Sequence, residues 1–570
     1  MTQRFLIGQI RWLPLVLAFI SVTGTFAQDE KQIAPVGRIY ALTNVTVVPS
    51  PGKKIEKATV VIKDGLIQAV GTAVSIPTDA IIMKADSMYV YAGFIDGLSR
   101  TGVIKPKDEP NPQRPKDPGN PPADKAGITP QNDVRNSLNP TDKSVEELRN
   151  IGFTLAQVVP YGHFLPGTSA IVLLGGKSAD EMVLVDQSGL YSELSGAQNV
   201  YPNTVMAVMA KWRELYRNAS LTKSYQALYA SNRSALTRPL NDRVEEAFYP
   251  VIDRKIPVVF KAEKILETQR VLTLKNDLGF SLTIGDLKEG YPMIDKVKTS
   301  GAKIFLSLDL PDEVKKNEKK SKNKNDSLKT AKTEKPKSAA ELEKQGLEKR
   351  KNDAIVKYTG QAADFHKAGI VFGFSAMSAK TKDIQSNLRR MIAAGLPEEV
   401  ALAALTTNPA KMLGLEDRLG TVENGKMANL VVSDKPYFNE KAKVRYVFVD
   451  GNLYKLDIKE PKKSNGSVVA KGNWSYTTET PNGTNNGKLT INDDNGTLSG
   501  TISNSTSGKG TEMKDVALDG NTLSFSFEYS MGGNTMKIDV SVKIDGDAFE
   551  GVMTPGKFGS FPMKGTRDPK

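Results

Sequence analysis

Residues 91–102, YAGFIDGLSRTG, decide how this chain folds. The apolar run that leads into Ile95 is typical of a buried β-strand, and the glycines around it mark turns. This strand delivers Leu98 and Arg100 to its C-terminal end. Parallel strands carry functional side chains at that end in barrel folds, so these two residues bear directly on what the protein can do.

The sequence after this strand alternates short apolar segments with longer amphipathic ones as far as Gly414. Such alternation predicts a parallel sheet, and the number of elements fits an α/β fold with a (β/α)₈ TIM barrel over residues 92–414. Two stretches interrupt the pattern. Residues 104–130 are rich in proline and charge, and we expect a long unpacked loop after the first barrel strand. Residues 311–352 are rich in lysine, and we expect a solvated or partly helical insertion.

Short β-branched runs flank the predicted barrel on both sides. Residues 37–91 contain a hairpin signal, KDG at 63–65, and residues 415–460 return to the same kind of pattern. We expect the two segments to form one composite β-sandwich. Residues 467–570 alternate polar and apolar positions between Asn-Gly and Asp-Gly turns, which predicts a separate antiparallel all-β domain, a sandwich or a small barrel.

The N-terminus has the pattern of an export signal. Arg4 and Arg11 precede an apolar run that is short for a membrane span, and small residues end at Ala27. We therefore expect a signal peptide at 1–27, a periplasmic or secreted protein, and no transmembrane span after cleavage. The chain has no cysteine, which excludes disulfides, thiolate metal sites and cysteine nucleophiles.

The net charge of +13 arises largely from one lysine-rich tract, residues 315–351. No basic face with interleaved aromatic residues and no nucleic-acid-binding motif accompanies it. We therefore expect no nucleic-acid partner.

Three stretches make the chain resemble the amidohydrolase superfamily, in particular its imidazolonepropionase-like and prolidase-like members. They are KDGLIQAVG (63–71) followed by YAGFIDG (91–97), AALTTNPAKMLGLEDRLGTVENGKMANLVV (403–432), and YVFVDGNLYK (446–455). The resemblance implies zinc or another divalent metal at the barrel mouth, where it would activate a water molecule against a C–N bond.

The resemblance also implies metal ligands that this chain lacks. The family's first barrel strand carries Asp-x-His-x-His, and here Asp96 is followed by Leu98 and Arg100, neither of which can bind a metal. Other residues replace the family's ligand and acidic positions on later strands: Lys261, Ile284, Ser375 and Asn429. The whole chain has two histidines, His163 and His366, so we expect no metal cofactor.

Barrel geometry predicts that five polar side chains converge at the mouth: Arg100, His163, Lys261, Asp286 and Ser375. Arg100 and Lys261 could hold an anion, or Asp96 could pair with Arg100. Alternatively, Leu98, Ile284 and Phe374 could fill the vacated space. Three functions follow: a non-catalytic structural or regulatory subunit of an active homologue or of a homo-oligomer, a barrel that binds a small anionic solute, and a C–N hydrolase with a rebuilt site that uses a lysine base.

Overall fold

The structure, a computed structural model, describes residues 39–106, 115–312, 339–456 and 469–568, without 481–482, 495–496, 505–509, 532–533 and 557–558. The predicted signal peptide lies outside the described residues, as does most of the lysine-rich insertion. Its last part, from Ala339, begins helix α8. In the described part of the chain, no helix combines the length and apolar character that a membrane crossing requires.

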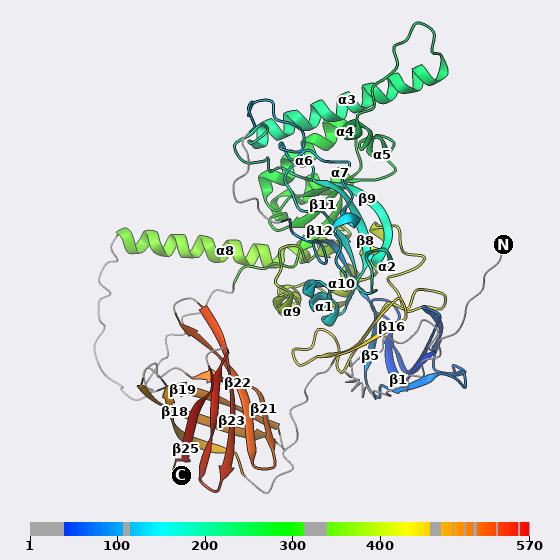
Figure 1. The fold of residues 1–570 in the computed structure, drawn as a ribbon. Helices are drawn as coiled ribbons and strands as arrows, with labels where there is room; N and C mark the ends of the chain where they lie inside the picture. The colour runs from blue at the N-terminus through cyan, green and yellow to red at the C-terminus, as the bar shows by residue number, and fades with distance from the viewer. Residues whose placement is uncertain are drawn as a thin grey trace, which may run out of the picture.

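Eight strands form a nearly closed barrel, which confirms the predicted α/β barrel (Figure 1). Their order in the sheet follows the sequence from one edge to the other, β13-β12-β11-β10-β9-β8-β7-β6. The strands are β6 (Phe94–Ser99), β7 (Phe153–Val158), β8 (Gly167–Leu173), β9 (Val183–Glu193), β10 (Val258–Lys261), β11 (Leu282–Leu287), β12 (Lys303–Ser307) and β13 (Phe372–Ser375).

One barrel strand departs from the all-parallel pattern that a (β/α)₈ barrel has. Strand β8 is antiparallel to both β7 and β9, whereas the other pairs of neighbours are parallel. The chain reaches β8 through the short loop 159–166, which is too short to hold a crossover helix. The barrel is therefore made of seven parallel strands and one antiparallel strand.

Helices pack around the outside of the barrel, and two of them extend well beyond it, α3 and α8 (Figure 1). The helices are η1 (Val134–Ser137), α1 (Lys143–Asn150), α2 (Ala179–Met182), α3 (Val205–Ser231), α4 (Arg243–Glu246), α5 (Tyr249–Ile252), α6 (Ile265–Leu278), η2 (Tyr291–Met293), α7 (Ile294–Ser300), α8 (Ala339–Lys367), η3 (Thr381–Asp383), α9 (Ile384–Ala393), α10 (Glu398–Leu405) and α11 (Thr407–Met412). His366 is exposed near the end of α8, away from the barrel interior.

A second sheet joins the two segments that flank the barrel in the sequence. Strand β5 pairs in parallel with β1 on one side and antiparallel with β14 on the other, which places residues 89–92 beside residues 430–433. The strands are β1 (Tyr40–Val48), β2 (Ile55–Lys63), β3 (Leu66–Gly71), β4 (Ile81–Lys84), β5 (Tyr89–Ala92), β14 (Leu430–Ser433), β15 (Val444–Val449) and β16 (Asn452–Lys455). The predicted KDG hairpin lies between β2 and β3, with Asp64 and Gly65 in the left-handed region.

The C-terminal region is an all-β meander of nine strands, in agreement with the prediction from its turns. Its first strand, β17, pairs with its last, β25. The edge strand β21 contacts β19, which lies next to the other edge strand, β20, so the sheet curls into a barrel around an apolar core. The strands are β17 (Gly472–Thr480), β18 (Gly483–Asp494), β19 (Thr497–Asn504), β20 (Thr511–Glu512), β21 (Lys514–Asp519), β22 (Thr522–Met531), β23 (Asn534–Asp545), β24 (Ala548–Pro555) and β25 (Phe561–Arg567). Two of its hairpins turn at Gly520 and Gly546, both of which have positive φ.

The sequence predicted that the proline-rich loop would be unpacked, but its last part is packed against the barrel. Ala126 and Ile128 are buried in the main core, and Ile128 forms a bridge with Leu165 in the loop after β7. The amide of Thr129 donates to the carbonyl of Leu165 over 2.8 Å. The end of this loop is therefore fixed against the segment that follows β7.

Candidate functional site

Large side chains fill the interior of the barrel. Phe305 on β12 is buried, and its ring occupies the space that a Cβ atom would need at Gly97 on β6 and at Gly373 on β13. The glycines of FIDG and of FGFS therefore make room for this ring. Since Phe305 reaches strand β6, which is not its neighbour in the sheet, its side chain crosses the barrel interior.

A second apolar layer surrounds Leu98. It forms a buried cluster with Val159, Tyr191 and Val259, and Met377 packs against the cluster. These residues come from or directly follow strands β6, β7, β9, β10 and β13, so they meet across the interior. Leu98 also lies where a side chain at Gly285 would be, since its Cδ2 is 2.3 Å from the Cβ position of that glycine. The residue that stands at a histidine position of the family thus serves as core.

Ile284 and Phe374 are buried but do not join these interior layers, which corrects the expectation that they would fill the old pocket. Ile284 lies opposite Ile304, and Phe374 lies opposite Leu306. Ile304 and Leu306 flank Phe305 on β12 and so point to the other side of the sheet, and residues in register share a face. Ile284 and Phe374 therefore belong to the core between the sheet and the helices.

The inward position on β11 is Gly285, which lies opposite Lys261. The resemblance to the family had placed Ile284 at a ligand position, which is one residue before the inward position on this strand. The register of β11 shifts after Ile284, where Asp286 has a φ of +57°. This irregularity was not visible in the pattern of apolar residues.

Asp96 and Ser375 connect β6 to β13, the two strands at the open edge of the sheet. The amide of Ala376 donates to Asp96 Oδ1 over 2.9 Å, and Ser375 Oγ donates to the carbonyl of Leu98 over 2.9 Å. Both side chains are fully buried. The two positions at which the family holds acidic groups therefore carry hydrogen bonds that close the barrel.

Asp96 retains one buried oxygen, Oδ2, with no hydrogen-bond partner. Burial raises the pKa of this carboxyl to about 7, the amides of Ala376 and Leu98 lower it in part, and the negative charge of Asp286 raises it further. An acid in such a place is stabilised in its neutral form.

Arg100 forms an ion pair inside the mouth. Its Nη2 lies 2.6 Å from Oε1 of Glu193, at the end of β9, and its guanidinium lies over the ring of Tyr161 at 4.7 Å. Tyr191 donates to the same carboxylate oxygen of Glu193 over 2.6 Å. Burial, followed by the charge of Glu193, raises the pKa of Tyr191. The positive charge of Arg100 is thus neutralised by a glutamate on β9, which is separated from β6 in the sheet by β8 and β7.

Lys261 is neutralised in the same way. The Nζ of Lys261 lies 2.7 Å from Oε1 of Glu263. The other oxygen of Glu263, Oε2, lies 3.8 Å from Nζ of Lys288, and Lys288 pairs with Asp309 at 2.7 Å. Burial alone would raise the pKa of Glu263, but the hydrogen bond and charge of Lys261 hold it below its usual value. These four side chains form an alternating chain of charges across the ends of β10, β11 and β12.

Asp286 lies between this chain of charges and the buried pair of Asp96 and Ser375. Its Oδ2 accepts from Ser378 Oγ over 2.5 Å, and its Oδ1 lies 3.3 Å from Ser375 Oγ. Ser378 also lies 3.2 Å from Glu263. Burial raises the pKa of Asp286. One connected network of hydrogen bonds therefore joins Ser375, Asp286, Ser378 and Glu263, and Asp96 is bonded to the amide of Ala376 beside it.

His163 is separate from this network. Its side chain is exposed in the loop after β7, and its Nδ1 lies 3.5 Å from Ser195 Oγ. Of the five polar residues expected at the mouth, Lys261, Asp286 and Ser375 lie in one network through Glu263 and Ser378, Arg100 lies in its own ion pair with Glu193, and His163 lies apart from both. The sequence missed the partners Glu193, Glu263, Lys288 and Ser378, although Glu193 and Glu263 follow apolar strands and so carried the same signal as the residues that were selected.

The donor set at the mouth does not fit a metal of the kind that the family binds. The inward side chains there end in a methyl group, a guanidinium, an ammonium and hydroxyls. Each of the four carboxylates at the mouth, on Asp96, Asp286, Glu193 and Glu263, has at least one oxygen in a hydrogen bond or an ion pair. Within the described residues, no group of three or more histidine, cysteine, aspartate or glutamate side chains is placed to hold a metal ion.

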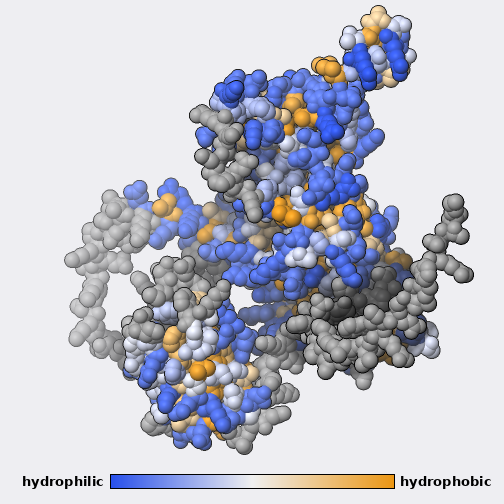
Figure 2. All heavy atoms as spheres, in the orientation of Figure 1, coloured by the Kyte–Doolittle hydropathy of each residue, from blue (hydrophilic) through white to orange (hydrophobic). Residues whose placement is uncertain are grey.

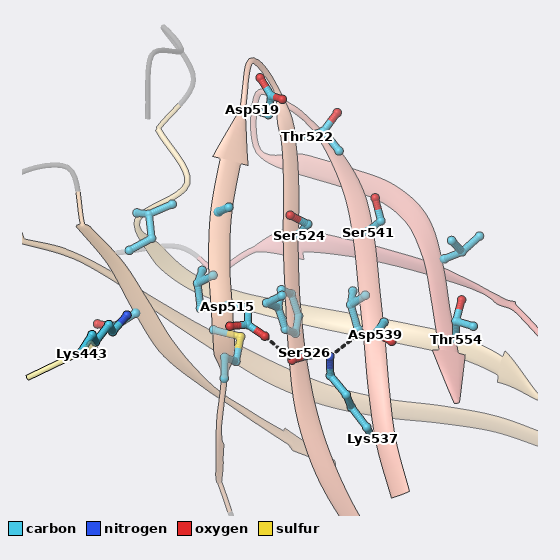
Figure 3. A pocket seen from close by; sticks show the side chains of 18 residues that line it. Lys443, Asp515, Asp519, Thr522, Ser524, Ser526, Lys537, Asp539, Ser541 and Thr554 are labelled. Atoms are coloured by element: carbon cyan, nitrogen blue, oxygen red, sulfur yellow. Dashed lines mark hydrogen bonds and ion pairs between the residues drawn. The ribbon is translucent and has the colours of Figure 1, made fainter. Parts of the chain in front are cut away.

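The C-terminal barrel carries a groove of about 1140 Å³ on strands β21 to β24 (Figure 3). Hydroxyls from Thr522, Ser524 and Ser541 line it together with carboxylates. Ser526 donates to Asp515 at 3.4 Å, and Lys537 forms an ion pair with Asp539 at 3.2 Å. These charged groups have partners within the groove, and the residues that line it are different from those at the mouth of the larger barrel.

Comparison with known proteins supports the resemblance that the sequence indicated. Residues 261–456 match the model of the amidohydrolase family. An amidohydrolase from Thermotoga maritima has a similar fold, with a TM-score of 0.56 and 20% identity over 73% of this chain and 100% of that one. A putative prolidase from Bifidobacterium longum matches at 15% identity and a TM-score of 0.42, over 74% of this chain and 95% of that one. No curated protein matches the sequence.

Proposed function

We propose that this chain, whose barrel has the amidohydrolase fold, is a non-catalytic member of the superfamily that serves as a structural or regulatory subunit. The observation that carries the proposal is the use of the old ligand positions for internal bonds. Leu98 is core, Arg100 and Lys261 are each paired with a glutamate, and Ser375 bonds across the seam to the carbonyl of Leu98 on β6.

The same observation argues against the two alternatives. A pocket for an anionic solute would need Arg100 and Lys261 free to face the ligand, but Glu193 and Glu263 already neutralise them. A rebuilt hydrolase would need a base that can reach a substrate. Asp96 is fully buried beneath the Leu98 layer, and the ammonium group of Lys261 is engaged in an ion pair with Glu263.

The activity arm of the test uses the full chain with zinc or manganese added. Xaa-Pro dipeptides, N-acyl amino acids and small lactams would be offered, with an active amidohydrolase as the positive control. We expect no hydrolysis above the rate in buffer. Metal-dependent turnover that disappears in Asp286→Asn would contradict the proposal and favour the rebuilt hydrolase.

The partner arm asks what the subunit assembles with. The proposed partner is an amidohydrolase that retains its metal-binding histidines, or a second copy of this chain. Affinity purification from the native cell, followed by mass spectrometry and light scattering, is expected to yield one of the two. A monomer without such a partner would contradict the subunit role.

We further propose that the chain is exported, in which case the mature protein begins after Ala27.

A further inference from the structure

Helix α3 continues beyond the barrel as an arm, which we define as residues 218–241. In Figure 1 the second half of α3 points away from the barrel and the chain returns through a loop to α4. The arm is tied at its base, where Lys223 pairs with Asp253. Its return segment is tied to the helix by Tyr225, which donates to the carbonyl of Thr237 over 2.6 Å. The arm is thus a defined projection.

Three leucines on the arm are more than half exposed. The exposed fraction is 70% for Leu221, 53% for Leu228 and 87% for Leu240. Leu221 and Leu228 are seven residues apart, two turns of helix, so they share a face. A single exposed leucine needs no explanation, but three leucines on one projection indicate a surface that a binding partner covers.

The charged residues of the arm indicate which kind of partner covers this surface. The chain has 64 acidic residues among 570, yet no aspartate or glutamate occurs between Leu215 and Asn241. The cations in this stretch are Arg217, Lys223, Arg233 and Arg238. Arg233 and Arg238 are exposed near the tip, and the guanidinium of Arg233 lies 5.7 Å from the ring centroid of Tyr229. Figure 2 shows the end of the arm apart from the body, with hydrophobic and hydrophilic patches side by side.

From these features we infer that the arm docks the protein on a membrane surface that carries anionic phospholipid headgroups. Leucine side chains enter the boundary between headgroups and acyl chains, and arginines bind the phosphates at the level of the headgroups. A second copy of the arm would bring like charges together without acidic partners, which disfavours pairing of two arms. The inference stands apart from the proposed lack of catalysis.

The test is sedimentation of the full chain with large vesicles of phosphatidylcholine alone or with about 30% phosphatidylglycerol. We expect binding to the anionic vesicles, with a several-fold loss at about 0.5 M salt. Replacing the leucines together (Leu221→Ser, Leu228→Ser, Leu240→Ser) is expected to lower the partition coefficient about tenfold or more. Replacing the arginines (Arg233→Gln, Arg238→Gln) is expected to lower it roughly tenfold.

Matched variants on other helices serve as controls. Leu266→Ser and Leu347→Ser remove leucines that are each 61% exposed, and Lys349→Gln with Arg350→Gln removes two exposed cations from α8. These variants should bind like the unchanged protein, and thermal melts should show that all variants fold. No binding to anionic vesicles, or equal loss in the control and arm variants, would overturn the inference. So would a dimer in the absence of vesicles that the leucine variant abolishes.

Discussion

At the scale of single residues, the vacated positions of the barrel mouth have been reused for packing and pairing. Leu98 was selected from the sequence because it cannot bind a metal, and the structure adds that its side chain fits over Gly285. The charges of Arg100 and Lys261 are evident in the sequence, but the sequence does not predict which acidic residues they pair with. Which glutamate faces which cation depends on the register of neighbouring strands, and alternation of apolar residues does not reveal register.

The contact between Leu98 and Gly285 gives a coupling that can be measured. Gly285→Ala places a methyl group against Leu98 and is expected to lower the free energy of unfolding by about 1–3 kcal/mol. Leu98→Ala leaves a cavity and costs about 2–5 kcal/mol. In the double variant the new methyl group occupies part of that cavity, so the combined loss should be smaller than the sum. Additive losses in denaturant titrations would show that the two residues do not meet.

The buried carboxyl of Asp96 predicts a dependence of stability on pH. Its pKa is about 7 in the folded protein and about 4 in an unfolded chain, so the folded state binds more protons between these values. The free energy of unfolding should therefore fall as the pH rises from about 4 to 7, and level off above that. Asp96→Asn, which does not titrate, should flatten this slope. An unchanged slope in the variant would exclude Asp96 as its source.

At the scale of elements, the order of the strands was predictable and their irregularities were not. The apolar segments that contain β6, β7, β10, β11, β12 and β13 stood out in the sequence because each is short and flanked by amphipathic stretches. The antiparallel direction of β8 did not, because the direction of a strand leaves no mark on its own residues. The register shift in β11, which lies after Ile284, also left no mark in the pattern of apolar residues. The inward position on this strand is Gly285, opposite Lys261, and not Ile284.

The seam between β6 and β13 is held in part by the side chains of Ser375 and Asp96. Ser375→Ala removes the hydroxyl that bonds to the carbonyl of Leu98 and leaves that carbonyl and Asp286 with one partner fewer. We expect a loss of about 1–3 kcal/mol in the free energy of unfolding. The control is Ser386→Ala, which removes a partly buried hydroxyl near the start of α9 and should cost less than about 1 kcal/mol. Equal losses would mean that the seam hydrogen bond contributes nothing particular.

At the scale of the whole molecule, the C-terminal barrel has a core of its own, built around Trp474, Phe525 and Phe549. We expect residues 467–570 to fold when produced alone. Trp474 is the only tryptophan in this segment and is fully buried, so its fluorescence should report a single cooperative transition in denaturant. A fragment without such a transition would show that the region depends on the rest of the chain.

The central claim is that the barrel mouth is held together by internal bonds at the positions where the resemblance to the amidohydrolases implies a metal. The most direct measurement is the number of metal ions bound per chain after equilibration of the full protein with zinc or manganese and removal of the excess. Our account predicts far less than one ion per chain, with no difference between the unchanged protein and Asp96→Ala. One or two ions per chain that are lost in Asp96→Ala would contradict it.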